Sequence, residues 1–225
     1  MVTKPDFAEF EFQTLPAERL SSAQRERVLG LFDACYKQAN ATYLERSLKK
    51  LGFVSLAERD GETVGFALGD ARVIDLPRLP RQVVVLAGLA CILPEFRRHG
   101  LFMELERRAF MAAEPPPAQH VLTCGRMAHP AAFRTMSHNP GVVPRRGVAP
   151  TAWQQEVGQA IADEYGVDAF DPQTFVCRGT GAPIGFPVIE VEVQPEEWEV
   201  FRQVSRDRGD SLLGIAWMPD APPGW

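Results

Sequence analysis

A short basic segment in the middle of the chain carries the residue types with the clearest chemistry. The segment Arg97-Arg98-His99-Gly100 lies between an apolar run, residues 83–93, and a stretch of helical periodicity that begins at Leu101. The run is rich in Val, Leu and Ile, as is typical of a strand buried on both faces. A turn from such a strand into a helix points free backbone N–H groups and the positive end of the helix dipole at one place. The spacing therefore predicts a site for a phosphate or pyrophosphate.

Known phosphate motifs fit this turn unequally. A dinucleotide fingerprint needs three glycines at set spacing and a P-loop needs Gly-Lys-Ser/Thr, so both fit poorly. An ordinary strand-turn-helix with a solvated basic turn also accounts for the short motif. The segment from Arg97 to Phe102, preceded by Leu-Pro-Glu-Phe, resembles the Arg/Gln-x-x-Gly-x-Gly/Ala loop of the GNAT acyltransferase superfamily. The match departs at Phe102, where Gly or Ala is usual, and this departure suggests longer acyl chains as a further option.

The GNAT resemblance implies a cofactor site on the central strand and the turn. In that family the loop binds the pyrophosphate of acetyl-CoA, and the pantetheine arm lies against the backbone of the central strand, whose N–H groups can polarise the thioester carbonyl. Carried over to this chain, the resemblance makes nine residues cofactor-binding: Ala90, Cys91, Ile92, Arg97, Arg98, His99, Gly100, Leu101 and Phe102.

The proton-transfer positions of the family are altered here. The helix after the fifth strand often begins Asn-x-x-Ala-x-x-x-Tyr, and the Tyr protonates the departing thiolate. The matching positions in this chain read His129, Ala132 and Met136. We expect His129 to be catalytic because its ordinary pKa suits proton transfer near neutral pH. The alternative is that it only caps a helix ahead of Pro130.

Cys124, in the short apolar strand predicted at 120–125, is the second catalytic candidate, as proton donor or nucleophile. Its alternative is plain core packing. Tyr36 and Tyr43 flank the junction of the first two predicted helices, which often lines the acceptor site in GNAT proteins, so we expect them to bind substrate; half-buried structural tyrosines are the alternative. The run 83–93 contains no carboxylate that could serve as a base.

The order of the elements agrees with the resemblance as far as residue 140. A strand is predicted at 7–15, then helices capped by Ser21 and Asn40, two strands around an Asp60-Gly61 hairpin, and the central strand and helix. Strand 120–125 and a helix from Pro130 follow. The resemblance implies an α/β fold with a GNAT-like mixed sheet of about seven strands, a V-shaped splay between strands 4 and 5, and flanking helices.

The C-terminal third is predicted to complete the same sheet. A helix is expected at 151–165, a strand at 188–193, a helix at 195–206 and a strand at 211–218. We expect residues 1–225 to form a single acyl-CoA-binding domain, with 140–186 as an insertion or elaboration before the last two strands.

Composition excludes several classes of function. The chain of 225 residues has 24 basic and 29 acidic residues, a net charge of −5, which argues against a nucleic-acid surface. No secretory start and no run long enough for a bilayer are present, so a cytoplasmic protein without a membrane partner is expected. The four cysteines lack a Cys-x-x-Cys pair and lie at no ligand spacing to the four histidines, which predicts reduced thiols and no metal.

The GNAT resemblance of the turn and of the element order implies an acyltransferase that moves an acetyl, or another acyl, group from CoA directly to a primary amine of a small molecule. A non-catalytic GNAT-fold module that binds acyl-CoA or a partner, as sensor or scaffold, is the alternative, because the usual Asn, Tyr and strand carboxylate are missing. The acceptor stays open, and so does the oligomeric state, with a homodimer among the options.

Overall fold

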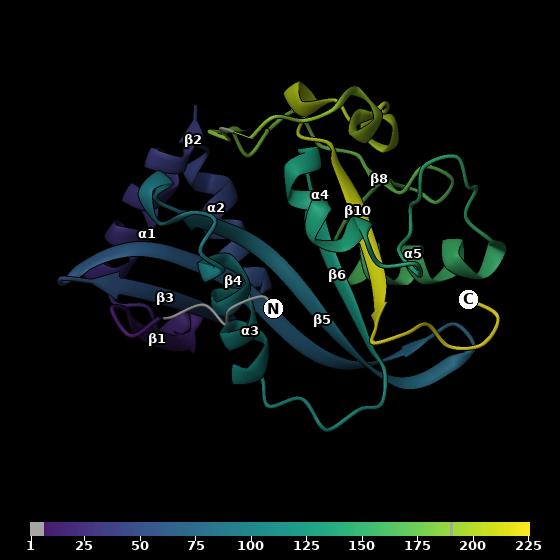
Figure 1. Cartoon of the computed structure of the whole chain (residues 1–225), viewed down its shortest axis with the longest axis horizontal. Coiled ribbons are helices and arrows are strands. Elements are labelled where there is room, and N and C mark those ends of the chain that lie inside the picture. Colours follow the sequence, from purple (N-terminus) through teal and green to yellow (C-terminus); the bar gives the residue numbers. More distant parts are fainter. Residues whose placement is uncertain (1–6, 190) are drawn as a thin grey trace. The chain divides into compact units, whose positions relative to one another are not determined.

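The strands form one mixed sheet in the described part of this computed structural model, residues 7–189 and 191–225 (Figure 1). The hydrogen-bonded order is β1-β3-β4-β5-β6-β10-β8-β7. The strands are β1 Glu11–Pro16, β3 Phe53–Arg59, β4 Glu62–Leu76, β5 Leu79–Ile92, β6 Val121–Met127, β7 Phe170–Asp171, β8 Val176–Cys177 and β10 Ser211–Met218. A separate two-stranded pair joins β2 Tyr36–Lys37 to β9 Phe186–Pro187. The predicted mixed α/β class is confirmed, with eight sheet strands in place of about seven.

The described residues group by their contacts into two units. The first contains residues 7–71, 87–114 and 185–188, and the second contains 72–86, 115–184, 189 and 191–225. The strand β5 changes unit within its length, because residues 79–86 group with β6 and residues 87–92 group with the first unit. The predicted strands 4 and 5 are β5 and β6, which are neighbours in the sheet order. That the whole chain is a single domain stays a prediction.

Helices cover the sheet of the first unit. They are α1 Ser22–Cys35, α2 Ala41–Lys50 and α3 Leu101–Ala112. The predicted caps are confirmed, since the Ser21 side chain accepts from Gln24 N in a capping box and Asn40 accepts from Tyr43 N. A Cβ built on Gly69 of β4 would meet Phe110 of α3, which shows how closely this helix lies on the strand.

The second unit is built around β6 and β10. These strands pair antiparallel from Leu212↔Met127 to Met218↔Val121. The helices are α4 Pro130–Ser137 and α5 Ala152–Glu164, with Thr151 capping α5 (Figure 1). Phe133 and Met136 of α4 approach the backbone at Gly214, and the Tyr165 hydroxyl after α5 donates to Cys124 O at 3.0 Å. The predicted last strand, 211–218, is confirmed residue for residue.

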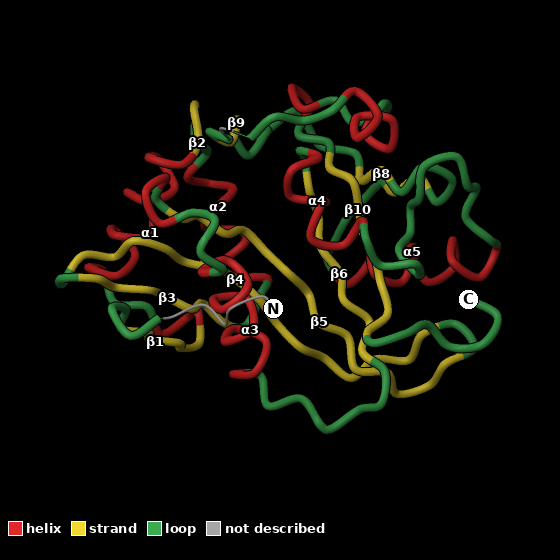
Figure 2. Tube along the Cα trace, viewed as in Figure 1, coloured by secondary structure: helices red, strands yellow, loops and turns green. Residues whose placement is uncertain are grey.

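Two predicted elements of the C-terminal third are wrong. The described residues of 188–193 are loop rather than strand, while Glu190 lies outside the described residues (Figure 2). The backbone pairs one step earlier instead, where Phe186–Pro187 joins β2 and Val188 N donates to Cys35 O at 2.8 Å. The predicted helix 195–206 is two short 3-10 helices, Pro195–Phe201 and Arg206–Arg208. The glycine- and proline-rich segment 168–186 contains the short strands β7 and β8 and the first residue of β9.

Candidate functional site

The backbone turn between β5 and α3 has the geometry of an anion-binding nest. A 3-10 turn, Pro94–Phe96, leads into Arg98 at φ 68° and Gly100 at φ 82°, both in the left-handed region. Left-handed residues that alternate with ordinary ones turn successive N–H groups toward one side of the chain. Glycine adopts this conformation freely, whereas it is unfavourable for Arg98 by about 1 kcal/mol. The turn therefore holds a strained backbone where the sequence predicted an anion site.

Most amides of this turn have no acceptor. Phe96 N donates to Leu93 O and Arg97 N donates to Pro94 O, which closes the 3-10 turn. Among residues 7–189 and 191–225, no acceptor is found for the backbone N–H groups of residues 98–103. Gly100 caps α3 without a side-chain hydrogen bond, so the helix start is open as well. Six consecutive N–H groups are thus available to a ligand.

Arg97 is committed to the protein itself. Its Nε donates to Ile92 O at 2.8 Å, its Nη1 donates to Val188 O at 2.6 Å, and its Nη2 lies 3.7 Å from Cys35 Sγ. The side chain is half-buried, whereas its neighbours Arg98 and His99 are exposed. This geometry does not support the predicted phosphate contact of Arg97, and it leaves Arg98 and His99 as the cationic and polar side chains beside the free amides.

The other predicted cofactor residues also lie in the first unit. Ala90, Cys91 and Ile92 form the end of β5, with Cys91 and Ile92 buried. Leu101 is buried in a core cluster with Leu105 of α3 and Ala57 of β3, and Phe102 packs half-buried against the same cluster. Phe102 therefore fills space beside the core while its backbone N–H stays without an acceptor.

Of the two predicted acceptor residues, Tyr36 lies near the cysteines Cys35 and Cys91. Tyr36 belongs to β2, and its ring lies 4.9 Å from the ring of Phe32. Burial, followed by the neighbouring Cys91 and Tyr43, raises the pKa of Tyr36, so this phenol stays protonated. Tyr43 lies in the first turn of α2, behind its Asn40 cap. Tyr36 thus lies near Tyr43 and Cys91, and the binding of an acceptor by the two tyrosines stays a prediction.

His129, which belongs to the second unit, is used as a helix cap. Its Nδ1 accepts from Ala131 N at 3.2 Å, and its ring lies 5.2 Å from that of Trp198. Burial lowers its pKa, aided by Arg206 and Arg134. A ring whose Nδ1 accepts carries its proton on Nε2, so neither a base at Nε2 nor an imidazolium acid is compatible with the cap. This placement favours the capping alternative, and the catalytic role stays a prediction.

A pair of variants at position 129 separates the two roles. We expect His129→Asn to keep the free energy of unfolding nearly unchanged, because Asn is a good N-cap, and His129→Ala to lower it by about 1 kcal/mol. Urea denaturation of both variants checks this. If His129 is catalytic instead, turnover falls equally in both variants, whatever their stability.

Cys124, in β6 of the second unit, is fully buried. Its thiol lies 3.9 Å from Leu122 O, and burial raises its pKa far above the usual value. A thiol in this setting stays protonated and has no exposed surface for a substrate, as core packing would give. Its catalytic role also stays a prediction.

Two titratable groups that the sequence analysis did not select stand out. Burial raises the pKa of Glu106 on α3 to about 8. Cys35, at the end of α1, has a pKa lowered to about 7 by a hydrogen bond from Cys91 and by Arg97. Glu106 lies four residues after Phe102, so the two residues share one face of α3, and this spacing can be seen in the sequence. The Cys35 setting depends on three distant segments and has no local signal.

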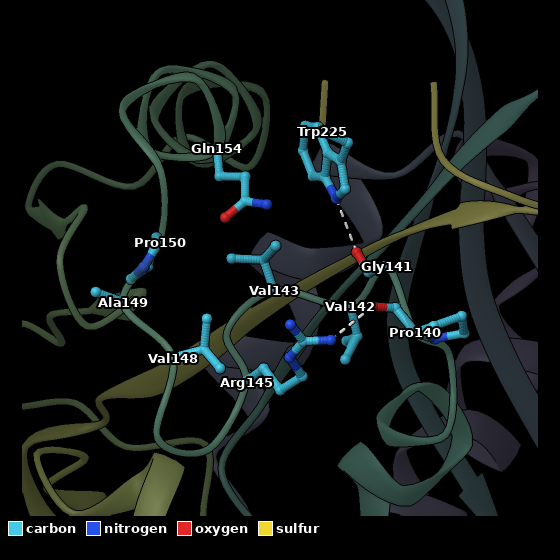
Figure 3. A pocket seen from close by; sticks show the side chains of 10 residues that line it. All are labelled: Pro140, Gly141, Val142, Val143, Arg145, Val148, Ala149, Pro150, Gln154 and Trp225. Carbon is cyan, nitrogen blue, oxygen red and sulfur yellow. Dashed lines mark hydrogen bonds between the residues drawn. The ribbon is translucent and has the colours of Figure 1, made fainter. Parts of the chain in front are cut away.

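A small pocket lies within the second unit, between residues 140–154 and Trp225 (Figure 3). The Trp225 Nε1 donates to Gly141 O at 2.8 Å, and Arg145 Nη1 donates to Pro140 O at 2.9 Å. The cavity encloses about 80 Å³, well below the roughly 300–1,000 Å³ of drug-sized ligand sites. It can take a few water molecules and is too small for a coenzyme thioester.

The described part of the chain holds neither a metal-ligand cluster nor a membrane-spanning helix. Within residues 7–189 and 191–225, no three His, Cys, Asp or Glu side chains come together as a metal site would require. In the same residues, no helix is both long and apolar enough to cross a bilayer.

Comparisons with known proteins find solved structures of low similarity. No family model matches the chain, and no curated protein matches it. It is similar to the ribosomal-protein-S18-alanine N-acetyltransferase of Escherichia coli, with 10% identity over 96% of this chain and 99% of that chain, at a TM-score of 0.43. It is also similar to the E. coli GNAT family N-acetyltransferase YhbS in complex with CoA, with 15% identity over 60% and 71% and a TM-score of 0.40.

A GNAT family acetyltransferase from Streptococcus pneumoniae matches with 18% identity over 46% of this chain and 67% of that chain, at a TM-score of 0.34. Because these identities and TM-scores are low, any assignment of function must come from the residues of this chain.

Proposed function

We propose that the chain is an acyl-CoA-dependent N-acyltransferase that moves an acetyl, or another acyl, group directly from CoA to a primary amine of a small molecule. One observation carries this proposal: the six backbone N–H groups of residues 98–103 have no acceptor among the described residues. A diphosphate offers enough oxygen atoms to accept from several such groups, and the start of α3 favours its negative charge.

The surroundings of the turn support the same ligand. Arg98 and His99 are exposed beside the free amides, so they can approach phosphate oxygens from solvent. Arg97 holds the end of β5 through Ile92 O, which fixes the strand residues Ala90 to Ile92 relative to the turn. In the proposed complex the turn binds the diphosphate, and the strand backbone binds the arm that carries the thioester.

Met103 allows one of these amides to be removed without touching the core. Its side chain is 55% exposed, and proline is tolerated in the first turn of a helix. We expect Met103→Pro to weaken CoA binding by about tenfold, because a hydrogen bond to a charged oxygen is lost. Isothermal titration with CoA measures the change.

Met103→Ala is the matched control, since it removes the same side chain and keeps the N–H group. Equal affinities of the proline and alanine variants would contradict diphosphate binding at the start of α3. Circular dichroism of both proteins verifies that α3 is retained.

The catalytic test measures thiol release. The protein is incubated with acetyl-CoA, and separately with longer acyl-CoA esters, in the presence of a panel of small primary amines. Acceptor-dependent release of CoA that falls in Met103→Pro and persists in Met103→Ala supports the proposal. The tyrosines are tested in the same assay, where Tyr36→Phe and Tyr43→Phe are expected to raise KM for the amine more than KM for acyl-CoA.

A non-catalytic module that binds acyl-CoA is the second candidate. It is favoured by His129, whose Nδ1 is used as a helix cap, and by Cys124, whose thiol is buried. CoA binding with no release of thiol across the amine panel would select this candidate. If the wild-type protein does not bind CoA at all, both the acyltransferase and the non-catalytic module are overturned.

A further inference from the structure

Three segments of the first unit meet at a pair of cysteine thiols. Cys35 ends α1 and Cys91 lies near the end of β5, 56 positions further along the chain. The Sγ of Cys35 lies 3.4 Å from O of Ile92, the residue next to Cys91, and Cys91 is close enough to lower the pKa of Cys35. The third segment supplies Arg97, whose Nη2 lies 3.7 Å from the same sulfur. A thiol pair with a guanidinium beside it differs from an isolated buried cysteine.

The contacts of Cys35 favour its ionised form. As a thiolate it accepts from the Cys91 thiol and from the Arg97 guanidinium, whereas only Ile92 O accepts from its neutral form. The Cys91 hydrogen bond and Arg97 outweigh burial and lower the pKa of Cys35 to about 7. Burial and the neighbouring Cys35 raise the pKa of Cys91. One sulfur is thus the nucleophile of the pair and the other keeps its proton.

The backbone beside Cys35 includes residues 186–188, of which the first two pair with β2. The two residues of β2 pair with only the two residues of β9, and Val188 N donates to Cys35 O at 2.8 Å. Arg97 Nη1 also donates to the same segment, at Val188 O. A two-stranded pair of this length is marginally stable in water. Cys35 is 4% exposed, so the proposal below requires local opening of residues 186–188 to admit a small reagent.

We propose that Cys35 and Cys91 form a peroxide-sensitive dithiol that Arg97 activates. The Cys35 thiolate attacks one oxygen of hydrogen peroxide, so that an S–O bond forms, the O–O bond breaks, and hydroxide leaves. The Cys91 sulfur then attacks the sulfenic acid, its thiol proton is released to the leaving hydroxyl, and water departs as the disulfide forms. Together the two sulfurs lose two electrons, which reduce peroxide to two waters.

Tryptic mapping tests the proposal directly, because each cysteine falls in a separate peptide. Cys35 lies in peptide 28–37, Cys91 in 82–97, Cys124 in 109–126 and Cys177 in 147–178. The full-length protein is treated with a small excess of hydrogen peroxide at pH 7, blocked with iodoacetamide and digested. We expect peptides 28–37 and 82–97 to be recovered joined, and to separate after dithiothreitol. In Cys91→Ser, dimedone is expected to trap a sulfenic acid at Cys35.

Arginine variants test the activation. At pH 7, Arg97→Gln is expected to slow alkylation of Cys35 by iodoacetamide about tenfold, with Arg97→Lys in between. Arg98→Gln is the matched control, since it removes an adjacent but exposed charge, and it should leave the rate unchanged. Alkylation of Cys124 and Cys177, both fully buried, reports any unfolding of a variant.

The proposal is overturned if no joined peptide forms while the protein is folded, if peroxide modifies Cys124 or Cys177 as fast as Cys35, or if Arg98→Gln slows alkylation as much as Arg97→Gln. None of these readouts involves CoA, so they do not depend on the proposed acyltransferase activity.

Discussion

Replacing Asp210 by alanine is expected to lower the free energy of unfolding by about 3 kcal/mol, since a buried carboxylate that accepts several hydrogen bonds is lost and its backbone donors are left without a partner. Asp210 is 1% exposed in the second unit. Its carboxylate accepts from Gly179 N at 2.8 Å, Ser205 N at 3.1 Å and Arg208 Nη2 at 2.7 Å, and Arg178 Nη1 lies at 3.4 Å. The bonds from Gly179 and Arg178 join the loop after β8 to the loop before β10, and the bonds from Ser205 and Arg208 lie within the second loop.

Urea denaturation of the variant measures the loss. Asp207→Ala is the matched control, because Asp207 lies three residues earlier in an exposed position. Its effect should stay within about 0.5 kcal/mol, as for most surface substitutions. A similar loss in both variants would mean that the stabilisation comes from net charge rather than from the buried carboxylate.

The pH dependence of this effect has a definite sign. Burial alone would raise the pKa of Asp210, but the bonds from Arg208, Gly179 and Ser205 outweigh it and lower the pKa below its usual 3.8. A carboxyl group with a lowered pKa in the folded state stabilises the fold above its unfolded pKa, and this contribution disappears as the pH falls through the folded value. The difference between wild type and Asp210→Ala should therefore be constant from about pH 5 to 8 and shrink below about pH 4.

Local signals in the sequence account for most of the fold. Ser21, Asn40 and Thr151 were selected as helix caps from residue type and position, and each accepts the expected backbone N–H. The Asp60-Gly61 turn joins β3 to β4 as predicted. In each of these cases the deciding interaction spans fewer than five residues, so the sequence contains it completely.

The failures arise where a distant segment decides the structure. The alternation in 188–193 is typical of a strand, yet the backbone there offers its hydrogen bonds to Cys35 and Arg97 instead of a neighbouring strand. Alternation describes which side chains could be buried but not whether a partner strand is present. Residues 195–206 likewise have helical periodicity in the sequence, but their backbone forms only 3-10 helices.

In the candidate site, too, the local pattern was predictable from the sequence and the contacts between distant segments were not. The turn 97–100 was found from its residue types, because a glycine between an apolar strand and a helix is a local pattern. The pattern could not distinguish Arg97 from Arg98. Their separation into a buried tie and an exposed cation depends on Ile92, Val188 and Cys35, which come from three places in the chain.

After the loss of Asp210, the largest expected decrease in the free energy of unfolding comes from adding one methyl group at Gly88 of β5. A Cβ there would lie 2.9 Å from Leu68 Cβ and 3.1 Å from Leu68 O on β4, and would also overlap the side chain of Leu51 after α2. Because a backbone oxygen and a strand Cβ cannot swing away, β4 and β5 must separate. We expect Gly88→Ala to lower the free energy of unfolding by about 2 kcal/mol.

Gly30 provides a control of opposite sign. It lies within α1 with no atom within 4 Å of an added Cβ, so Gly30→Ala should stabilise the protein by about 1 kcal/mol through helix propensity. Gly88→Ala should also weaken CoA binding, because Ala90 to Ile92 follow directly on the same strand and their backbone is proposed to hold the coenzyme arm. Urea denaturation and CoA titration of both variants measure the two effects. A Gly88→Ala protein that loses stability but binds CoA with unchanged affinity would place the arm away from this end of β5.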